Sequence, residues 1–195
     1  MKKVILVLLV FAVVCGSAFA VDFDILSYPS SLKGGDILVD LGIGYAGWGS
    51  TIGGKTKIPP LIVSGEYCLP VGLPISVGGM FSISSYTWEW NDPTYTNPHK
   101  TTYTYLIFAP RGNWHWGFDI DWLDLYTGVS TGYRHFFWKY NGPNADYFSR
   151  YHSWNYGGFY IGTQLGAHFY ITNFIGANVE FGWPIYAKAA VSLKF

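Results

Sequence analysis

The last ten residues, Tyr186-Ala187-Lys188-Ala189-Ala190-Val191-Ser192-Leu193-Lys194-Phe195, decide the fold class of this chain. Successive side chains of a β-strand point to opposite faces. One face of this stretch is therefore wholly apolar and consists of Ala187, Ala189, Val191, Leu193 and Phe195. The other face carries Lys188 and Lys194. Such alternation is typical of a membrane β-strand, which is apolar toward lipid and polar toward a lumen.

Seven more segments repeat this alternation along the chain. They cover residues 36–48, 59–69, 75–89, 102–118, 124–138, 156–170 and 175–183. The connections between them alternate long and short, as in outer-membrane barrels, where short turns face the periplasm and longer loops face outward. We therefore predict an all-β fold: an eight-stranded antiparallel transmembrane β-barrel with the order of an up-and-down meander. Pro110 lies inside one segment and predicts a bulge or a split there.

Composition separates this barrel from a water-soluble β-sandwich, which has the same strand periodicity. The aromatic share of 20% is high, and the charged share of 12% is about half of what soluble domains usually carry. Trp88, Trp138 and Trp183 lie near the predicted ends of strands. That position is typical of the aromatic belts at the level of lipid headgroups. The composition therefore favours a barrel in lipid.

Residues 1–20 are typical of a secretory signal peptide, because Lys2 and Lys3 precede an apolar run and Ala18-Phe19-Ala20 is a small-x-small cleavage site. We expect cleavage after Ala20, a periplasmic lead-in over residues 21–35 and the barrel over residues 36–195. Cleavage would remove two lysines and no acid, leaving ten basic residues against twelve acids, too few for a nucleic-acid partner. Cys68 would then be the single cysteine, so no internal disulfide could form.

Five short stretches resemble the small bacterial outer-membrane β-barrel proteins of the OmpX and OmpW kind. They are residues 34–44 (GGDILVDLGIG), 59–67 (PPLIVSGEY), 75–79 (ISVGG), 126–129 (YTGV) and 132–133 (GY). In that family the assembly machinery reads the terminal aromatic strand, so the resemblance implies an assembly signal at Phe195, Leu193 and Val191. It also implies the outer membrane as the location, with its lipid bilayer and the assembly machinery as partners. Most of this family has no assigned activity.

Charged residues gather on the predicted inner faces of the strands. They are three acids and three bases, namely Asp40, Glu66, Arg111, Arg134, Glu180 and Lys188. The interior of an eight-stranded barrel is just wide enough for side chains to fill, and an unpaired buried charge is destabilising. We therefore expect a paired network that plugs the lumen. The alternative is a narrow channel for small or hydrophobic solutes, lined by the same residues.

The sequence gives no support for catalysis, a cofactor or a metal site. His152 and Ser153 are adjacent, so on an extended chain their side chains point to opposite faces and do not readily form a base–nucleophile pair. His115 and His168 are expected to face inward, with no cysteine or carboxylate at ligand spacing. We predict a protein that is not an enzyme and binds no cofactor.

The long outer loops are the remaining candidates for an interaction. The third loop holds residues that could stack on a glycan or contact a host partner: Tyr147, Phe148, Arg150, Tyr151 and Trp154. The same aromatic side chains could instead lie on lipid headgroups. The predicted function is a small outer-membrane protein with a structural or surface-interaction role.

Overall fold

The computed structural model describes residues 23–46, 54–91, 93–94, 98–143 and 156–195. Its strands are β1 (Phe23–Asp24), β2 (Ile37–Tyr45), β3 (Lys55–Cys68), β4 (Ile75–Trp90), β5 (His99–Phe118), β6 (Leu123–Asn141), β7 (Tyr156–Tyr170), β8 (Ile175–Gly182) and β9 (Ala187–Lys194). The described residues contain no helix with the length and apolar character needed to span a membrane.

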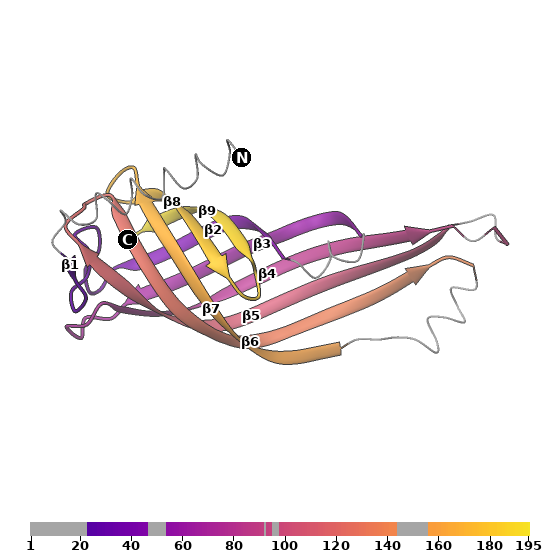
Figure 1. Ribbon diagram of the computed structural model, residues 1–195, viewed down its shortest axis with the longest axis horizontal. Coiled ribbons are helices and arrows are strands. Elements are labelled where there is room, and N and C mark those ends of the chain that lie inside the picture. The colour runs from indigo at the N-terminus through magenta and orange to yellow at the C-terminus, as the bar shows by residue number, and fades with distance from the viewer. Residues whose placement is uncertain (1–22, 47–53, 92, 95–97, 144–155) are drawn as a thin grey trace, which may run out of the picture.

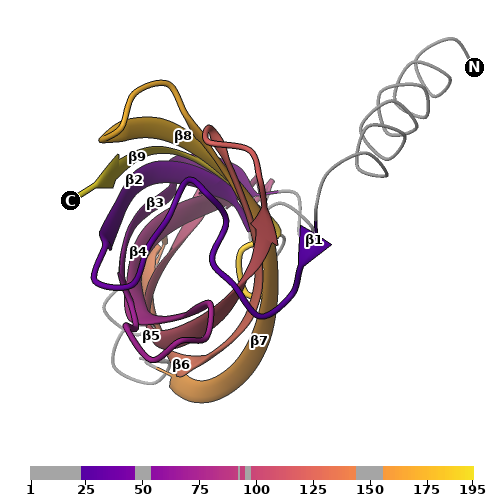
Figure 2. The same cartoon turned by 90° about the vertical axis from the view of Figure 1, so that its left-hand side faces the viewer.

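Strands β2 to β9 form a closed barrel. Each pairs antiparallel with the next along the chain, and β2 also pairs with β9, from Leu38 opposite Lys194 to Tyr45 opposite Ala187. Viewed from the end of the barrel where the C-terminus lies, the strands surround a common interior (Figure 2). The predicted eight-stranded antiparallel meander is therefore confirmed.

The barrel is apolar on its outer face and polar in its interior, which is the reverse of a water-soluble protein. Large apolar side chains are exposed on the outer wall, among them Leu41, Val63, Phe81, Phe108, Val129, Leu165, Phe181 and Val191. Charged and polar side chains are buried inside, among them Asp40, Glu66, Arg111, Asn113 and Lys188. Because apolar surface is stable in lipid and polar groups are not, this wall is a transmembrane surface.

The strands differ greatly in length. β5 has 20 residues and β6 has 19, whereas β8 and β9 have 8 each. At about 3.3 Å per residue, β5 is about 66 Å long and β9 about 26 Å. A strand needs only about 9–11 residues to cross a bilayer. The longer strands therefore continue beyond the barrel (Figure 1). We call residues 86–90 of β4, 99–103 of β5 and 138–141 of β6 the protruding sheet.

The expectation of a bulge or split at Pro110 is wrong. β5 is continuous, and it keeps a single register with β4 on one side and with β6 on the other. Pairing with β6 merely omits Ala109 and Pro110 and then resumes unchanged. Since proline lacks the N–H that a ladder needs, the barrel loses these pairs without inserting a residue. The register shifts instead lie in β3, between Thr56 and Leu61, where Pro59 and Pro60 stand.

We call the end of the barrel opposite the protruding sheet its inner end, and the other its outer end. The lead-in segment crosses the mouth at the inner end, as the indigo ribbon shows in Figure 2. β1 pairs with the end of β5. The hydroxyl of Tyr28 then donates to the carbonyl of Ile75 at 2.6 Å, and burial raises the pKa of this hydroxyl. Lys194 Nζ donates to the carbonyl of Ser31 at 2.6 Å. These contacts join the lead-in to the barrel and to its last strand at one mouth.

Candidate functional site

The barrel interior brings five of the six predicted charged residues together. Arg111 lies between two acids: its Nη2 is 2.6 Å from Glu180 Oε2, and its Nε is 3.2 Å from Glu66 Oε1. Lys188 Nζ is 3.2 Å from the same Glu180 oxygen and 3.0 Å from Asp40 Oδ2. None of the five residues is more than 7% exposed. Every charge in this group therefore has an opposite charge in contact.

Three further ionisable residues extend this group, and sequence reasoning did not assign them to it. Asp124 is fully buried between two histidines: its Oδ1 is 2.8 Å from His115 Nδ1 and its Oδ2 is 2.8 Å from His168 Nδ1. His168 Nε2 is in turn 3.3 Å from Asp40 Oδ1. On the other side, His115 Nε2 is 2.9 Å from the hydroxyl oxygen of Ser76, which donates to Glu66 at 2.6 Å.

These contacts close into a cycle of alternating acids and bases, which we call the charge ring. In order it contains Glu66, His115, Asp124, His168, Asp40, Lys188, Glu180 and Arg111, and it returns to Glu66. Together with Ser76, which bridges Glu66 and His115, it draws on every strand from β2 to β9. The ring therefore connects the whole circumference of the barrel through its interior.

The hydrogen-bond geometry around the two histidines of the ring predicts their protonation state. Because Ser76 gives its proton to Glu66, its oxygen must accept from His115 Nε2, while His115 Nδ1 faces the carboxylate of Asp124. His168 faces a carboxylate at each nitrogen. All four ring nitrogens therefore act as donors, which only the imidazolium form allows. With both histidines in this form, the ring would hold four positive charges, including Arg111 and Lys188, against four carboxylates and would be neutral.

An apolar layer lies on each side of the charge ring. The layer toward the outer end consists of Ile62, Met80, Ile107, Ala109 and Ile185, with Tyr160 packed against it. The layer toward the inner end consists of Leu32, Leu38, Cys68 and Tyr170, with Tyr28 packed against it. Ile185 comes from the β8–β9 connection and Leu32 from the lead-in. Segments outside the eight strands therefore complete both layers.

The cavity beside the charge ring is small. A cavity of about 10 Å³ lies between the ring and the outer layer, and its walls include Met80, Arg111, Glu180 and Ile185. A cavity of this size holds about one water molecule. The charges and the apolar layers thus fill this part of the lumen with protein atoms.

Arg134 and the predicted loop residues lie elsewhere. Arg134 is half-buried, and in register it stands opposite Ile107 of the outer apolar layer, beyond the ring. Tyr147, Phe148, Arg150, Tyr151 and Trp154 fall outside the described residues, as do His152 and Ser153. The alternation of side chains could have identified Asp124. It stands two residues before Tyr126, so the two side chains lie on the same inner face of β6.

Ser76 contacts His115, and His115 contacts Asp124, in the same order as the serine, histidine and carboxylate of a catalytic triad. All three are completely buried, however, and the serine hydroxyl donates its hydrogen bond to Glu66 rather than to the histidine. A nucleophile must be reachable by its substrate and must give its proton to the base. This arrangement therefore serves the charge ring. The described residues also contain no cluster of histidine, cysteine and carboxylate ligands suited to a metal ion.

A second feature is an aromatic patch on the protruding sheet, formed by Trp88, Trp90, His99, Trp138 and Tyr140. The rings of Trp90 and His99 stack at 4.8 Å, and those of Trp138 and Tyr140 at 6.1 Å, each pair inclined by 11°. His99 Nδ1 is hydrogen-bonded to the Tyr140 hydroxyl at 2.5 Å. Trp88 is 40% exposed at the edge of this group. Trp88 is thus the most exposed member of the patch, whereas His99 and Tyr140 are buried.

Comparison with known proteins gives similarity of fold only. No family model matches the chain, and no curated protein is significantly similar to it. Among solved structures, the chain is similar to Ail, the attachment invasion locus protein of Yersinia pestis, at 10% identity and a TM-score of 0.44, over 84% of this chain and all of that one. Ail in complex with the heparin analogue sucrose octasulfate gives a TM-score of 0.42. A de novo designed transmembrane β-barrel gives 13% identity and a TM-score of 0.43, over 85% of this chain and 99% of the other.

Proposed function

We propose that this protein is a small outer-membrane barrel with a closed lumen and a structural or surface-interaction role. The observation that carries the proposal is the charge ring sealed between two apolar layers. Such an interior connects the strands through ion pairs and hydrogen bonds, and it leaves no continuous path for a solute through the protein.

The outer wall and the N-terminus together support the proposed location. The exposed apolar side chains need lipid around them, and residues 1–20 have the pattern of a secretory signal peptide. A barrel that is exported in this way would reach the outer membrane, with both ends of the mature chain on the periplasmic side. The protruding sheet would then extend from the cell surface.

The narrow channel is the weaker alternative. A conducting path needs a connected aqueous space, whereas the cavity beside the ring has a volume of about 10 Å³. A charged lining in a channel would also be hydrated, but the ring residues are almost completely buried and in contact with one another. The interior therefore fits the role of a plug better than that of a pore.

The aromatic patch supports the interaction role. Aromatic side chains with polar groups give a large, rigid contact surface at low entropic cost, and a partner can use both stacking and hydrogen bonds. Trp88 is exposed, and its neighbours are held in place by stacking. A glycan or a host protein at the cell surface is the kind of partner that we propose for this patch.

The testing experiment combines conductance with a binding screen. The purified barrel is reconstituted in planar bilayers, and the closed lumen predicts no steady current above that of the bare membrane. The same preparation is screened against glycans and extracellular-matrix proteins, with Trp88→Ala as the variant in the aromatic patch. Trp122→Ala is the matched control, since Trp122 is also exposed but lies at the inner end. A steady current would overturn the plug, and binding that Trp122→Ala weakens as much as Trp88→Ala would overturn the patch.

A further inference from the structure

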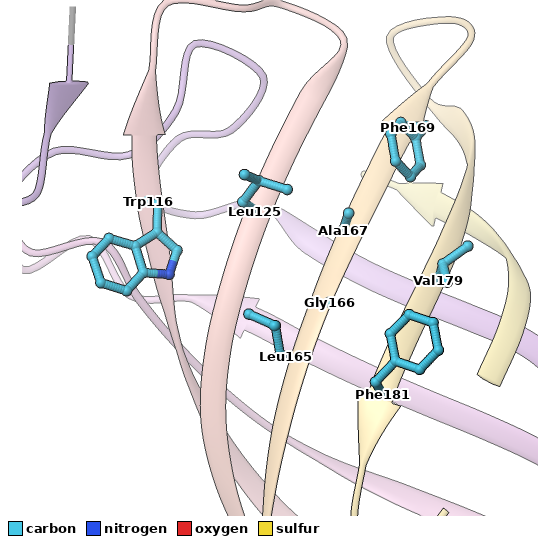
Figure 3. Close-up of a pocket in the computed structure, with 8 residues that line it drawn as sticks. All are labelled: Trp116, Leu125, Leu165, Gly166, Ala167, Phe169, Val179 and Phe181. Atoms are coloured by element: carbon cyan, nitrogen blue, oxygen red, sulfur yellow. The ribbon is translucent and has the colours of Figure 1, made fainter. Parts of the chain in front are cut away.

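A large apolar groove on the outer wall, with a volume of about 610 Å³, contains no charged side chain. Its walls include Leu125, Leu165 and Phe181 (Figure 3). Because we propose that this wall lies in the bilayer, ordinary acyl chains fill such a groove. A site that selects one ligand usually adds a few polar groups to an apolar or aromatic surface. The inward face at the outer end of the barrel has this combination.

Arg134 lies on the inward face of β6, just beyond the outer apolar layer. In register it stands between Ile107 of that layer and Gly158 of β7. Tyr105 and Tyr160 stand diagonally across from it on the two neighbouring strands, and its charge is near both hydroxyl groups. Arg134 is half-buried, so part of its surface is accessible to a molecule from outside.

Aromatic rings form a continuous row beside Arg134, which we call the aromatic row. It crosses four neighbouring strands, and its successive ring centroids are 6.1, 5.9 and 5.9 Å apart; its members are Tyr86, Tyr105, Phe136 and Tyr156. Phe136 follows Arg134 by two residues on the same face of β6, and Trp138 of the aromatic patch follows next. The row therefore connects Arg134 with the patch.

The space beside Arg134 on its β7 side is open. A Cβ atom at Gly158 would meet only one atom within 4 Å beyond its chain neighbours, a ring carbon of Tyr156 at 3.9 Å. β8 does not cover this part of β7, since the two strands pair only between Gln164 and Tyr170. Figure 1 likewise shows β8 and β9 ending well short of the outer ends of β4, β5 and β6. A ligand at the outer end therefore has room beside Arg134.

The charges at this end of the described chain favour an anion. On the inward faces of β4 to β7 beyond the outer apolar layer, strand alternation places Arg134 and, within the described ranges, no acid. Nearby strand ends carry one exposed acid, Glu89, and four exposed lysines, namely Lys55, Lys57, Lys100 and Lys139. Such an excess of positive charge attracts anions from solution. A guanidinium group binds a carboxylate through two parallel hydrogen bonds.

We propose that Arg134 and the aromatic row bind an acidic oligosaccharide, with one sugar carboxylate on Arg134 and the following sugar rings over Phe136 and Trp138. An extended occupant fits because Arg134 and Trp138 are four residues, or about 13 Å, apart along β6. A single small anion does not span that distance. This inference rests on the proposed surface-interaction role and deepens it, because it names the class of glycan and the residue that selects it.

The test is calorimetric titration of the purified barrel in detergent micelles. The probes are a short oligomer of galacturonic acid and its methyl ester, which has the same sugar rings without the negative charges. We expect the acid to bind about tenfold or more tightly than the ester, the factor that a charge-assisted hydrogen-bonded pair supplies. Arg134→Gln should remove this difference. Equal affinities for the two probes, or no binding of the acid, overturn the proposal.

Lys139→Gln is the matched control for the charge. It also removes one cation from β6, but Lys139 is exposed on the face opposite to Arg134. This variant should keep the preference for the acid. If it loses the preference as completely as Arg134→Gln does, general attraction between charges explains the binding and the role of Arg134 is refuted.

Gly158→Leu tests the position of the site without removing a charge. Because the space at Gly158 is open, the larger side chain fits the fold and occupies the room beside Arg134. Binding of the acid should fall several-fold. A variant that binds the acid like the wild type would show that the ligand does not lie beside Arg134.

Trp88→Ala separates this inference from the proposed function. A neutral glycan whose binding is weakened by Trp88→Ala and not by Arg134→Gln would leave the interaction role standing and overturn only the acidic site. Binding of the acid that depends on Arg134 and is unchanged in Trp88→Ala would support the acidic site and contradict the role proposed for Trp88. A sulfated neutral oligosaccharide that binds as tightly as the acid would overturn the choice of a carboxylate.

Discussion

Lys188 Nζ on β9 lies 3.0 Å from Asp40 Oδ2 on β2, across the seam that closes the barrel. The two residues are not opposite each other in the ladder, since Lys188 pairs with Gly44 and Asp40 with Ser192. The lysine side chain therefore runs along the interior to reach the acid, where it also contacts Glu180. One cation thus joins the first, the last and the next-to-last strands of the barrel.

We expect Lys188→Met and Asp40→Asn to be strongly coupled. Removing one partner of a buried ion pair typically costs about 3–5 kcal/mol, because an uncompensated charge is left behind. The double variant should cost less than the sum of the two single changes. Urea unfolding in lipid vesicles measures the three free energies of unfolding.

Lys100→Met supplies the matched control for this cycle. Lys100 forms an ion pair of 2.7 Å with Glu89 on the protruding sheet, where both side chains are exposed. Exposed pairs contribute little to stability, because solvent screens them. Additive free energies for Lys188→Met and Asp40→Asn, or a loss no larger than that of Lys100→Met, would contradict the charge ring.

A second prediction concerns the two histidines of the ring. At neutral pH, nitrogen NMR of the folded barrel should show hydrogen on both ring nitrogens of His115 and of His168, because all four nitrogens face acceptors. Asp124→Asn removes one negative charge from the neutral ring and should convert one of the two histidines to the neutral form.

Asp36→Asn is the control for the histidine measurement. Asp36 is also buried, but it accepts a hydrogen bond from the backbone N–H of Lys33 at the inner mouth and is not in the ring. This variant should leave both imidazolium signals unchanged. A neutral imidazole at His168 in the wild-type barrel would show that the assigned hydrogen-bond directions are wrong.

The alternation of residues allowed the strands and their faces to be predicted, whereas the contacts inside the barrel could not be. Because the side chains of a strand alternate with a period of two, the sequence shows on which face of their strands Asp40 and Lys188 lie. Their contact depends on the stagger between β2 and β9, which local sequence does not encode. Asp124 was missed because it stands directly after a turn, where a charged residue is usually solvated. The third loop, with Tyr147 and Trp154, lies outside the described residues.

The lead-in should stabilise the barrel through the inner apolar layer. Leu32 is 6% exposed and packs with Leu38, Cys68 and Tyr170, so Leu32→Ala should lower the free energy of unfolding by about 2–5 kcal/mol. Leu26→Ala is the control in the same segment: Leu26 is 60% exposed, and its loss should change stability by less than about 0.5 kcal/mol. Equal unfolding curves for the two variants would show that the lead-in does not belong to the folded unit.

The last prediction concerns Phe195 and distinguishes assembly from stability. Its backbone N–H and carbonyl exchange two hydrogen bonds of 2.9 Å with Ile37, and its side chain is 70% exposed. Deleting Phe195 should cost only about 1–3 kcal/mol, since a hydrogen bond contributes roughly 0.5–1.5 kcal/mol and the paired residues from Leu38 to Tyr45 remain.

The resemblance to small outer-membrane barrels implies a much larger effect of the same deletion on delivery to the membrane. Phe195→Ala separates the two contributions, because it keeps both backbone hydrogen bonds and removes only the ring. If the ring is the assembly signal, Phe195→Ala should lower the amount of protein in isolated outer membranes as much as the deletion does, while its unfolding in vesicles stays close to that of the wild type. A deleted chain that reaches the outer membrane at the normal yield would refute the signal, and the terminal aromatic side chain would then be only one more apolar group on the lipid-facing wall.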